Sequence, residues 1–224
     1  MRAAFFDMDR TILSENSGKS WLQFQYKRGE IGAGYMARAV YWQMLYRMAV
    51  LDMAALAEKL VADAKGDLES DMIAKCEIWL EEHLVKTISP SAVEQIKKHH
   101  EAGDVVVMIT GASQFAAYPI AKLVGIEHVL CTVLEVQEGI FTGKLANMCF
   151  GEHKVGLAER FAAEHGLDLS SSIFYTDSYN DLPLLNRVGE GVAINADARL
   201  LRQARKRGWR VENWAHQRGP ARAL

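Results

Sequence analysis

The chain has 224 residues, 50% of them hydrophobic, which is enough to bury a substantial core in one large domain or in a domain with an insertion. Its formal net charge of −2 is too small to favour nucleic acid or an acidic-substrate funnel through bulk attraction. Any electrostatic selectivity must therefore come from local groups of charges.

The cysteines and the N-terminus both favour a cytoplasmic protein. Cys76, Cys131 and Cys149 are odd in number and widely spaced, so they support neither a disulfide framework nor a zinc site. The N-terminus lacks the basic segment, apolar run and small-residue cleavage site of a secretory signal. We therefore expect a reducing, cytoplasmic location.

The chain begins with a short apolar run, residues 3–7, that predicts a buried strand ending in carboxylates. If the extended backbone continues, Asp7, Asp9 and Thr11 point to one side, because side chains on a strand alternate between faces. Two carboxylates held so close repel each other unless a cation or a shared proton lies between them. The stretch is therefore interpreted as half of a metal site.

Residues 14–87 are predicted to be helical throughout, and are interpreted as an insertion between core segments 1–13 and 88–224. The most apolar part, residues 35–57, is long enough to span a bilayer. However, Arg38, Arg47 and Asp52 interrupt it, and each costs roughly 2.5–3.5 kcal/mol at the centre of a membrane helix. Arg38 and Arg47 lie on opposite sides of a helix, so we predict a helix packed on several sides and no transmembrane segment. A dimer or lipid-surface contact is the alternative.

Residues 32–37, Gly-Ala-Gly-Tyr-Met-Ala, match the dinucleotide-binding fingerprint with alanine in the last place. No strand precedes them, although the fingerprint requires one. The segment is therefore predicted to be a turn between two helices.

From residue 88 onward, helices alternate with strands. Expected strands cover 105–109, 129–136, 140–143, 172–175, 191–194 and 209–211, with helices over 90–102, 114–123, 152–165, 182–186 and 198–207. Such alternation predicts the α/β class, with a Rossmann-like, mainly parallel sheet covered by helices on both faces.

Ligands of such sheets bind beyond the carboxyl ends of the strands, where the unusual polar residues of this chain gather. These residues are Asp7 and Asp9, Thr110 and Ser113, and Asp177 and Asp181. Four converging carboxylates call for a hard divalent cation, and Mg²⁺ is expected because it takes few carboxylates, keeps waters and bridges to phosphate oxygens. For Asp181 alone, a turn or helix cap is an equal alternative.

The same edge carries groups suited to an anion. Thr110 offers a hydroxyl, and the amides of Gly111 and Ala112 precede a helix. Lys154, near the start of another helix, is the cation expected to face a phosphate, with a solvated surface lysine as the alternative. This equipment suits phosphoryl transfer to an aspartate, with a second acid protonating the leaving alkoxide.

Four stretches resemble, in order, the motifs of the haloacid dehalogenase superfamily of phosphatases: residues 7–11 (Asp-Met-Asp-Arg-Thr), Thr110, Lys154 and residues 177–181 (Asp-Ser-Tyr-Asn-Asp). The resemblance covers nearly the whole chain. The helical insertion resembles the cap of the phosphoserine-phosphatase-like branch, which includes some histidinol-phosphate phosphatases. It implies a catalytic core domain of residues 1–13 and 88–224, and a helical cap domain of residues 14–87.

The resemblance also implies roles for individual residues. Asp7 would be the nucleophile that becomes aspartyl-phosphate, and Asp9 the general acid that later activates water. The phosphoryl group would be bound by Thr110, Gly111 and Lys154. The implied Mg²⁺ ligands are Asp7, the backbone carbonyl of Asp9, and Asp177, with Asp181, Thr11 and Asn180 in support.

Two positions depart from the family pattern. Arg10 stands where the family usually has Gly or Ser, so it either contacts the substrate or points away. Serine-specific members are expected to carry Glu where this chain has Asn16, with Glu15 one place before it. Histidinol phosphate or a similar small ester is therefore favoured over phosphoserine. Candidates for substrate contact in the cap are Trp21, Tyr26, Arg28, Arg38, Trp42 and Arg47.

Two other functions would account for parts of the pattern. A non-catalytic, receiver-type phospho-acceptor domain also uses an Asp cluster, a Thr and a Lys, but such domains are much shorter and have no helical insertion. Nucleic-acid binding would use the basic residues near the C-terminus, which are scattered over a terminal helix and indicate a solvated face. These are Arg199, Arg202, Arg205, Lys206, Arg207 and Arg210. We therefore expect a small-molecule phosphate ester as partner, no nucleic acid, and leave a homodimer open.

Overall fold

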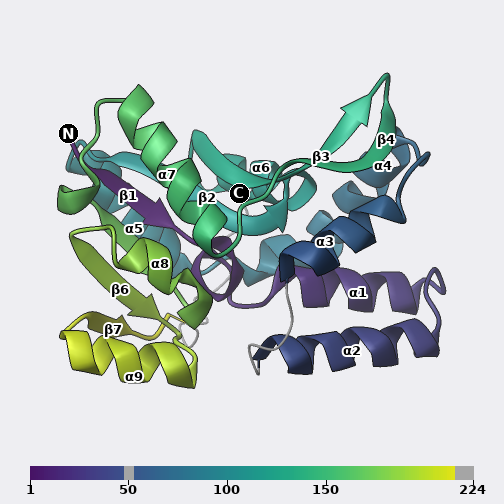
Figure 1. The fold of residues 1–224 in the computed structure, drawn as a ribbon, viewed down its shortest axis with the longest axis horizontal. Coiled ribbons are helices and arrows are strands. Elements are labelled where there is room, and N and C mark those ends of the chain that lie inside the picture. The colour runs from purple at the N-terminus through teal and green to yellow at the C-terminus, as the bar shows by residue number, and fades with distance from the viewer. Residues whose placement is uncertain (48–52, 215–224) are drawn as a thin grey trace.

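The computed structural model describes residues 1–47 and 53–214, apart from the side chains of residues 40, 43–47 and 53–55. Within these residues, seven strands form one sheet in the order β4-β3-β2-β1-β5-β6-β7 (Figure 1). Neighbouring strands are parallel, except that β3 and β4 form an antiparallel hairpin. The strands are β1 (Ala3–Phe6), β2 (Val105–Ser113), β3 (His128–Gln137), β4 (Ile140–Asn147), β5 (Ile173–Thr176), β6 (Glu190–Ile194) and β7 (Arg210–Glu212).

Strand β1 lies inside the sheet because all four of its residues are apolar and fully buried. Ala4 and Phe6 pack into the core layer under one set of helices, whereas Ala3 and Phe5 pack into the other layer. The first layer is covered by α5 (Pro90–Glu101) and α6 (Gln114–Leu123), and the second by α7 (Glu152–Glu164), α8 (Leu182–Leu185) and α9 (Ala198–Arg207). The predicted α/β class, with helices on both faces, is confirmed.

The segment between β1 and α5 is mainly helical in its described residues, with turns between the helices, as predicted. Its main helices are α1 (Ser17–Lys27), α2 (Ala33–Arg47), α3 (Met53–Ala62) and α4 (Glu69–Trp79), and short helical turns continue to Thr87. The predicted turn at residues 32–37 is wrong except at Gly32, because α2 begins at Ala33 and includes the rest of that segment. The predicted continuous helix over 35–57 passes through residues 48–52, which lie outside the described part, as does the side chain of Arg47. None of the helices in the described ranges is both long and apolar enough to cross a membrane.

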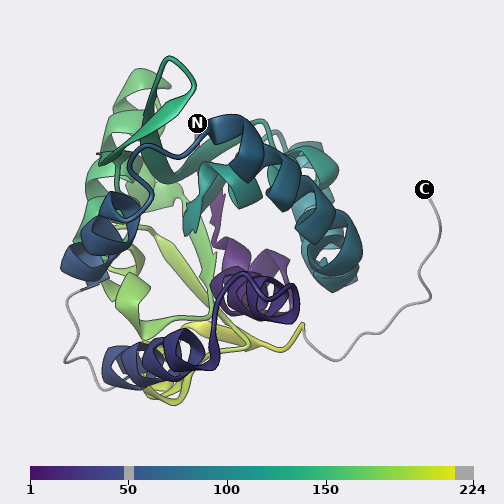
Figure 2. The ribbon, with the colours of Figure 1, turned by 90° about the vertical axis from the view of Figure 1, so that its right-hand side faces the viewer.

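Backbone contacts join the helical segment to the rest of the chain at its ends and in its middle. At its ends, Leu13 pairs with Ile88, and the Ser14 amide donates to the Thr87 carbonyl at 2.7 Å. In its middle, the connection from α3 to α4 lies against the β3–β4 hairpin, where the Phe141 amide donates to the Asp67 carbonyl at 3.0 Å. Figures 1 and 2 show the helices α1 to α3 on the side toward which β1 points. The helices therefore flank the carboxyl ends of the strands.

Two further local predictions are wrong. Extended backbone does not reach Thr11, because β1 ends at Phe6 and the chain turns through Met8–Ile12, with Arg10 in the left-handed region at φ 56° and ψ 8°. The turn leads the chain into the helical segment, so strand alternation does not place Thr11. The strand predicted at 105–109 continues to Ser113, because it keeps pairing with β3 across an irregularity after Thr110.

Candidate active site

Two neighbouring strands deliver the central carboxylates. Asp7 directly follows β1, and its amide donates to the carbonyl of Tyr175 in β5 at 2.9 Å. Asp177 directly follows β5, and both carboxylates are buried. The parallel pairing of β1 with β5 therefore brings the first and the last predicted motifs to one edge of the sheet, as expected from the sequence.

Lys154 lies between two of these acids. It sits in the first turn of α7, only 3% exposed, with Nζ 2.9 Å from Asp7 Oδ1 and 2.9 Å from Asp181 Oδ1. Burial by itself lowers the pKa of Lys154, but the carboxylates of Asp181 and Asp7 outweigh that effect and raise it. Lys154 is therefore a charged, buried group, and the alternative of a solvated surface lysine is wrong. Asp181 is likewise bonded through its side chain and does not use it to cap α8.

The acids at this edge hold more negative charge than Lys154 offsets. Burial raises the pKa of Asp7 to about 7, with a further contribution from the Asp181 carboxylate and opposition from Lys154. Burial, followed by the Asp7 carboxylate, raises the pKa of Asp177 to about 8. Arg10 opposes this second shift, because its Nε lies 3.4 Å from Asp177 Oδ2. A further cation near Asp7 and Asp177 would relieve the repulsion between them.

The donor types fit Mg²⁺. In the part of the chain that the structure describes, no three Asp, Glu, His or Cys side chains surround a common metal position. The ligand set that the resemblance implies, Asp7, Asp177 and the Asp9 carbonyl, has only two carboxylates and stays a prediction. Mg²⁺ favours sites with few carboxylates, in which waters complete the coordination, over cages made entirely of protein ligands.

Asp9 is held by the start of the first inserted helix. Its carboxylate accepts from the Ser17 amide at 2.9 Å and from Asn16 Nδ2 at 2.8 Å. Asn16 is also the N-cap of α1, since its side-chain oxygen accepts from the Lys19 amide. Burial raises the pKa of Asp9, and the bonds from Ser17 oppose that rise. The second acid of the first motif is therefore tied to the helical segment.

The remaining predicted residues lie at the same edge with bonds of their own. The buried Thr110 hydroxyl accepts from the Ala112 amide at 3.2 Å. Gly111 packs closely, since a Cβ there would lie 3.2 Å from the Phe150 ring. Asn180 bonds Ser178, and the buried hydroxyl of Thr11 has no hydrogen-bond partner among the described residues. The structure thus joins Asp7, Lys154 and Asp181 directly through the Lys154 ammonium.

Asp197 was missed by the sequence reasoning. It follows β6 and caps α9, and its Oδ2 accepts from the Tyr179 amide at 2.8 Å. Its own amide donates to the Asp177 carbonyl at 2.9 Å. An Asp three residues after the end of β6 was the available signal, since Asp7 and Asp177 also follow the ends of parallel strands.

The candidate cap residues mostly contact their own helices. Trp21 packs against Trp79 and Phe24, and the Arg28 guanidinium lies over the Phe24 ring. Arg38 lies over the rings of Tyr35 and Trp42, and Tyr26 is exposed. These contacts do not orient a substrate.

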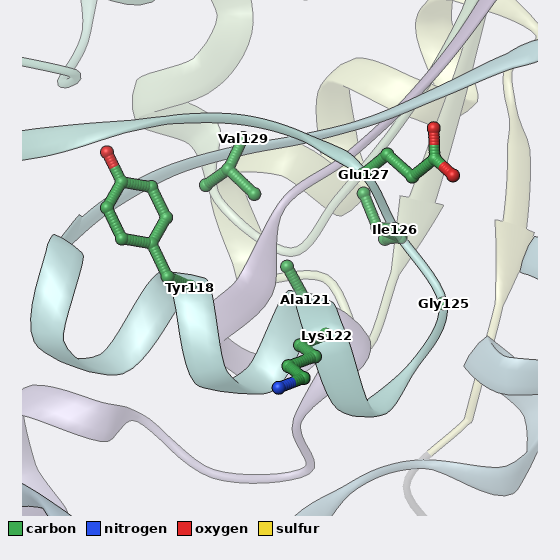
Figure 3. A pocket seen from close by; sticks show the side chains of 7 residues that line it. All are labelled: Tyr118, Ala121, Lys122, Gly125, Ile126, Glu127 and Val129. Carbon is green, nitrogen blue, oxygen red and sulfur yellow. The ribbon is translucent and has the colours of Figure 1, made fainter.

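A groove of about 390 Å³ lies away from these groups. Figure 3 shows it between α6, which supplies Tyr118 and Lys122, and the start of β3, which supplies Val129. None of the predicted site residues lines it, so it is not part of the candidate site.

Comparisons with known proteins identify the family of the chain. The model of the haloacid dehalogenase-like hydrolase family matches residues 4–186. A phosphoserine phosphatase of Mycobacterium tuberculosis is 34% identical over 98% of this chain and 73% of its own length. A histidinol-phosphatase of Neisseria meningitidis is 31% identical over 94% of this chain and 98% of its own.

Solved structures share the fold. A Bordetella pertussis protein of unknown function has a TM-score of 0.84 at 30% identity, covering 94% of this chain and 97% of its own. A phosphoserine phosphatase solved as a phospho-aspartyl intermediate analogue has a TM-score of 0.71 at 20% identity, covering 95% and 92%. At that identity the second likeness supports the fold alone.

Proposed function

Because the chain belongs to the haloacid dehalogenase-like hydrolases and is a phosphatase, we propose that it hydrolyses a small phosphorylated metabolite, with Mg²⁺, through an aspartyl-phosphate on Asp7. The observation that carries the proposal is the buried trio of Asp7, Lys154 and Asp181 at the end of β1. A buried carboxylate held by an ammonium and lying beside a second acid, Asp9, is suited to nucleophilic attack on phosphorus.

The reaction has two steps in this proposal. A carboxylate oxygen of Asp7 bonds to phosphorus as the ester P–O bond breaks, and Asp9 gives its proton to the leaving alkoxide. Asp9 then takes a proton from the water that attacks phosphorus, which frees Asp7 and inorganic phosphate. The raised pKa of Asp9 supports its role as the acid. Mg²⁺, held by Asp7, the Asp9 carbonyl and Asp177, would offset charge on the phosphoryl oxygens.

Thr110, the Gly111 amide and Lys154 bind the phosphoryl group in this proposal, and residues 14–87 act as the cap over a core of residues 1–13 and 88–224. Asn16 is neutral and occupied by Asp9 and the α1 cap, so it offers no carboxylate to a substrate ammonium. Glu15 is exposed. We therefore favour histidinol phosphate or a similar ester over phosphoserine. The three free, buried cysteines are consistent with the cytoplasmic location that we propose.

The test uses the purified chain with an aryl phosphate and with a panel that includes histidinol phosphate and phosphoserine. Hydrolysis should require Mg²⁺, stop with chelator, and be lost in Asp7→Asn, which keeps the shape of the side chain but not the nucleophile. Glu15→Gln, a charge change on an exposed neighbour, should leave turnover near wild type. Turnover by Asp7→Asn, or a long-lived phospho-protein without turnover, would contradict the proposal, and the second result would indicate a receiver-type domain.

A further inference from the structure

Arg10 has a strained and fixed backbone. Its left-handed conformation, at φ 56°, disfavours any residue with a Cβ. Two hydrogen bonds hold it there: the Arg10 amide donates to the Glu15 carbonyl at 3.1 Å, and the Arg10 carbonyl accepts from Asn195 Nδ2 at 2.7 Å. Strain that is held from both sides is characteristic of functional sites, because the surroundings must maintain it. The backbone therefore fixes the position of the Arg10 Cα, from which the side chain extends.

The guanidinium of Arg10 contacts Asp177. Its Nε lies 3.4 Å from Asp177 Oδ2, with 41% of the Arg10 side chain and 11% of the Asp177 side chain exposed. Arginine cannot lose this charge at any working pH, and its fork can bind a carboxylate firmly. The ion pair therefore joins a permanently charged, partly exposed guanidinium to a buried carboxylate.

Arg10 is the cation available to Asp177. Lys154, the other cation of the cluster, has its ammonium between Asp7 and Asp181. Among the side chains that the structure describes, no other basic group forms an ion pair with Asp177. The partly exposed position of Arg10 also leaves it a path to solvent.

We propose that Arg10 competes with the divalent cation for Asp177 and thereby lowers the metal affinity of the site. The inference rests on the proposed function, in which Asp177 is a metal ligand. A divalent ion at Asp177 would have to displace the guanidinium from Oδ2 and would then lie near a like charge. Arg10 thus offsets part of the negative charge at Asp177 and sets the concentration at which the metal binds.

The experiment measures Mg²⁺ binding to the full chain by titration calorimetry, without substrate, after chelator treatment and dialysis. Arg10→Gln removes the charge but keeps much of the length, so its Kd for Mg²⁺ should fall by roughly threefold to tenfold. Arg10→Lys keeps the charge and should bind Mg²⁺ much as wild type does. Arg205→Gln removes an exposed charge on α9 and controls for net charge.

Equal or weaker binding by a folded Arg10→Gln variant, compared with a wild type that binds Mg²⁺, would overturn this inference alone. A wild type that binds no divalent ion would overturn both the inference and the Mg²⁺ dependence proposed above. Tighter binding by Arg10→Gln in a chain without phosphatase activity would support the inference while the proposed function fails. Circular dichroism of each variant establishes that the binding data come from folded protein.

Discussion

Lys154 is the residue whose loss should disturb the site most. Its ammonium lies between the carboxylates of Asp7 and Asp181, all three buried. Lys154→Met keeps the volume but leaves two buried carboxylates without their cation, which typically costs about 3–5 kcal/mol. Urea unfolding at neutral pH should measure that loss, and turnover should fall with it. Lys122→Met, on the exposed groove, is the matched control and should change neither.

Asp104 should account for part of the loss of folding stability at acidic pH. It accepts from Arg2 at 2.7 Å and lies 2.7 Å from His99 Nδ1. Burial acts to raise the pKa of Asp104, but the bonds from Arg2 and His99 outweigh it, so the pKa is lowered. A carboxyl with a lowered folded pKa contributes stability above its unfolded pKa, near about 3.9, and loses it as the pH falls through the folded value.

The corresponding variant is Asp104→Ala, which leaves Arg2 and His99 without their acceptor. It should lose about 1–3 kcal/mol of unfolding free energy at pH 7. Urea unfolding from pH 7 downward should give a gap between wild type and variant that narrows only below about pH 4. Glu94→Ala breaks an exposed ion pair with Lys98 and should cost much less. A difference in unfolding free energy that stays constant below about pH 4 would contradict the assignment of this stability to the Asp104 carboxylate.

At the scale of single elements, α1 should couple helix stability to the second aspartate. Asn16 caps α1 and also donates to the Asp9 carboxylate at 2.8 Å. Asn16→Ala removes both bonds, so it should cost about 0.5–2 kcal/mol in unfolding free energy and lower turnover. Asn16→Asp keeps a good cap but sets a carboxylate against Asp9.

The two variants should therefore distinguish the effect of Asn16 on the stability of α1 from its effect on Asp9. In unfolding and in steady-state kinetics, Asn16→Asp should lose less stability than Asn16→Ala while turnover falls by roughly tenfold, since the acid loses a donor and faces a like charge. Ser14→Ala, an exposed position before the helix, is the control. Full activity in Asn16→Asp would show that the bond to Asp9 has no role in turnover.

Elements with a strong local pattern were predictable, and the turns that build the site were not. The run Val105–Ile109 indicates a buried strand on composition alone, because β-branched residues suit that environment. The left-handed backbone at Arg10 was not predictable, because it depends on Asn195, which lies 185 residues away in sequence. The hydrogen bonds of Asn16 to Asp9 and of Asp197 to Tyr179 were not predictable for the same reason, because the fold sets their partners.

For the whole molecule, the strand pattern was sufficient to place Asp7 and Asp177 at one sheet edge, since parallel strands end together, whereas Lys154 on α7 had a solvated surface position as its alternative. What the sequence did not indicate is the contact of the helical segment with the β3–β4 hairpin. There the amides of Gly66 and Glu69 donate to the carbonyls of Phe141 and Gly139 at 3.0 and 2.9 Å. Backbone bonds between segments far apart in sequence leave no side-chain pattern to find.

Gly143 should be the weak point of that contact. It has φ +79°, and a Cβ there would lie 2.8 Å from Lys65 Cβ and 3.4 Å from Ala62 Cα. Gly143→Ala therefore combines backbone strain with a clash that forces the two segments apart. Together, these effects should lower the free energy of unfolding by about 2–4 kcal/mol. Hydrogen exchange at the Gly66, Glu69 and Phe141 amides should accelerate as the segments separate.

The matched variant is Gly166→Ala, which has φ +63° and no atom within 4 Å of the added Cβ. It shares the backbone strain, of about 1–2 kcal/mol, but lacks the clash, so exchange at the hairpin contact should stay at the wild-type rate. If both variants accelerate exchange there equally, the effect is global destabilisation and the close approach is unimportant. If only Gly143→Ala does so, the hairpin holds the inserted helices over the strand ends, because the contact opens without unfolding the sheet.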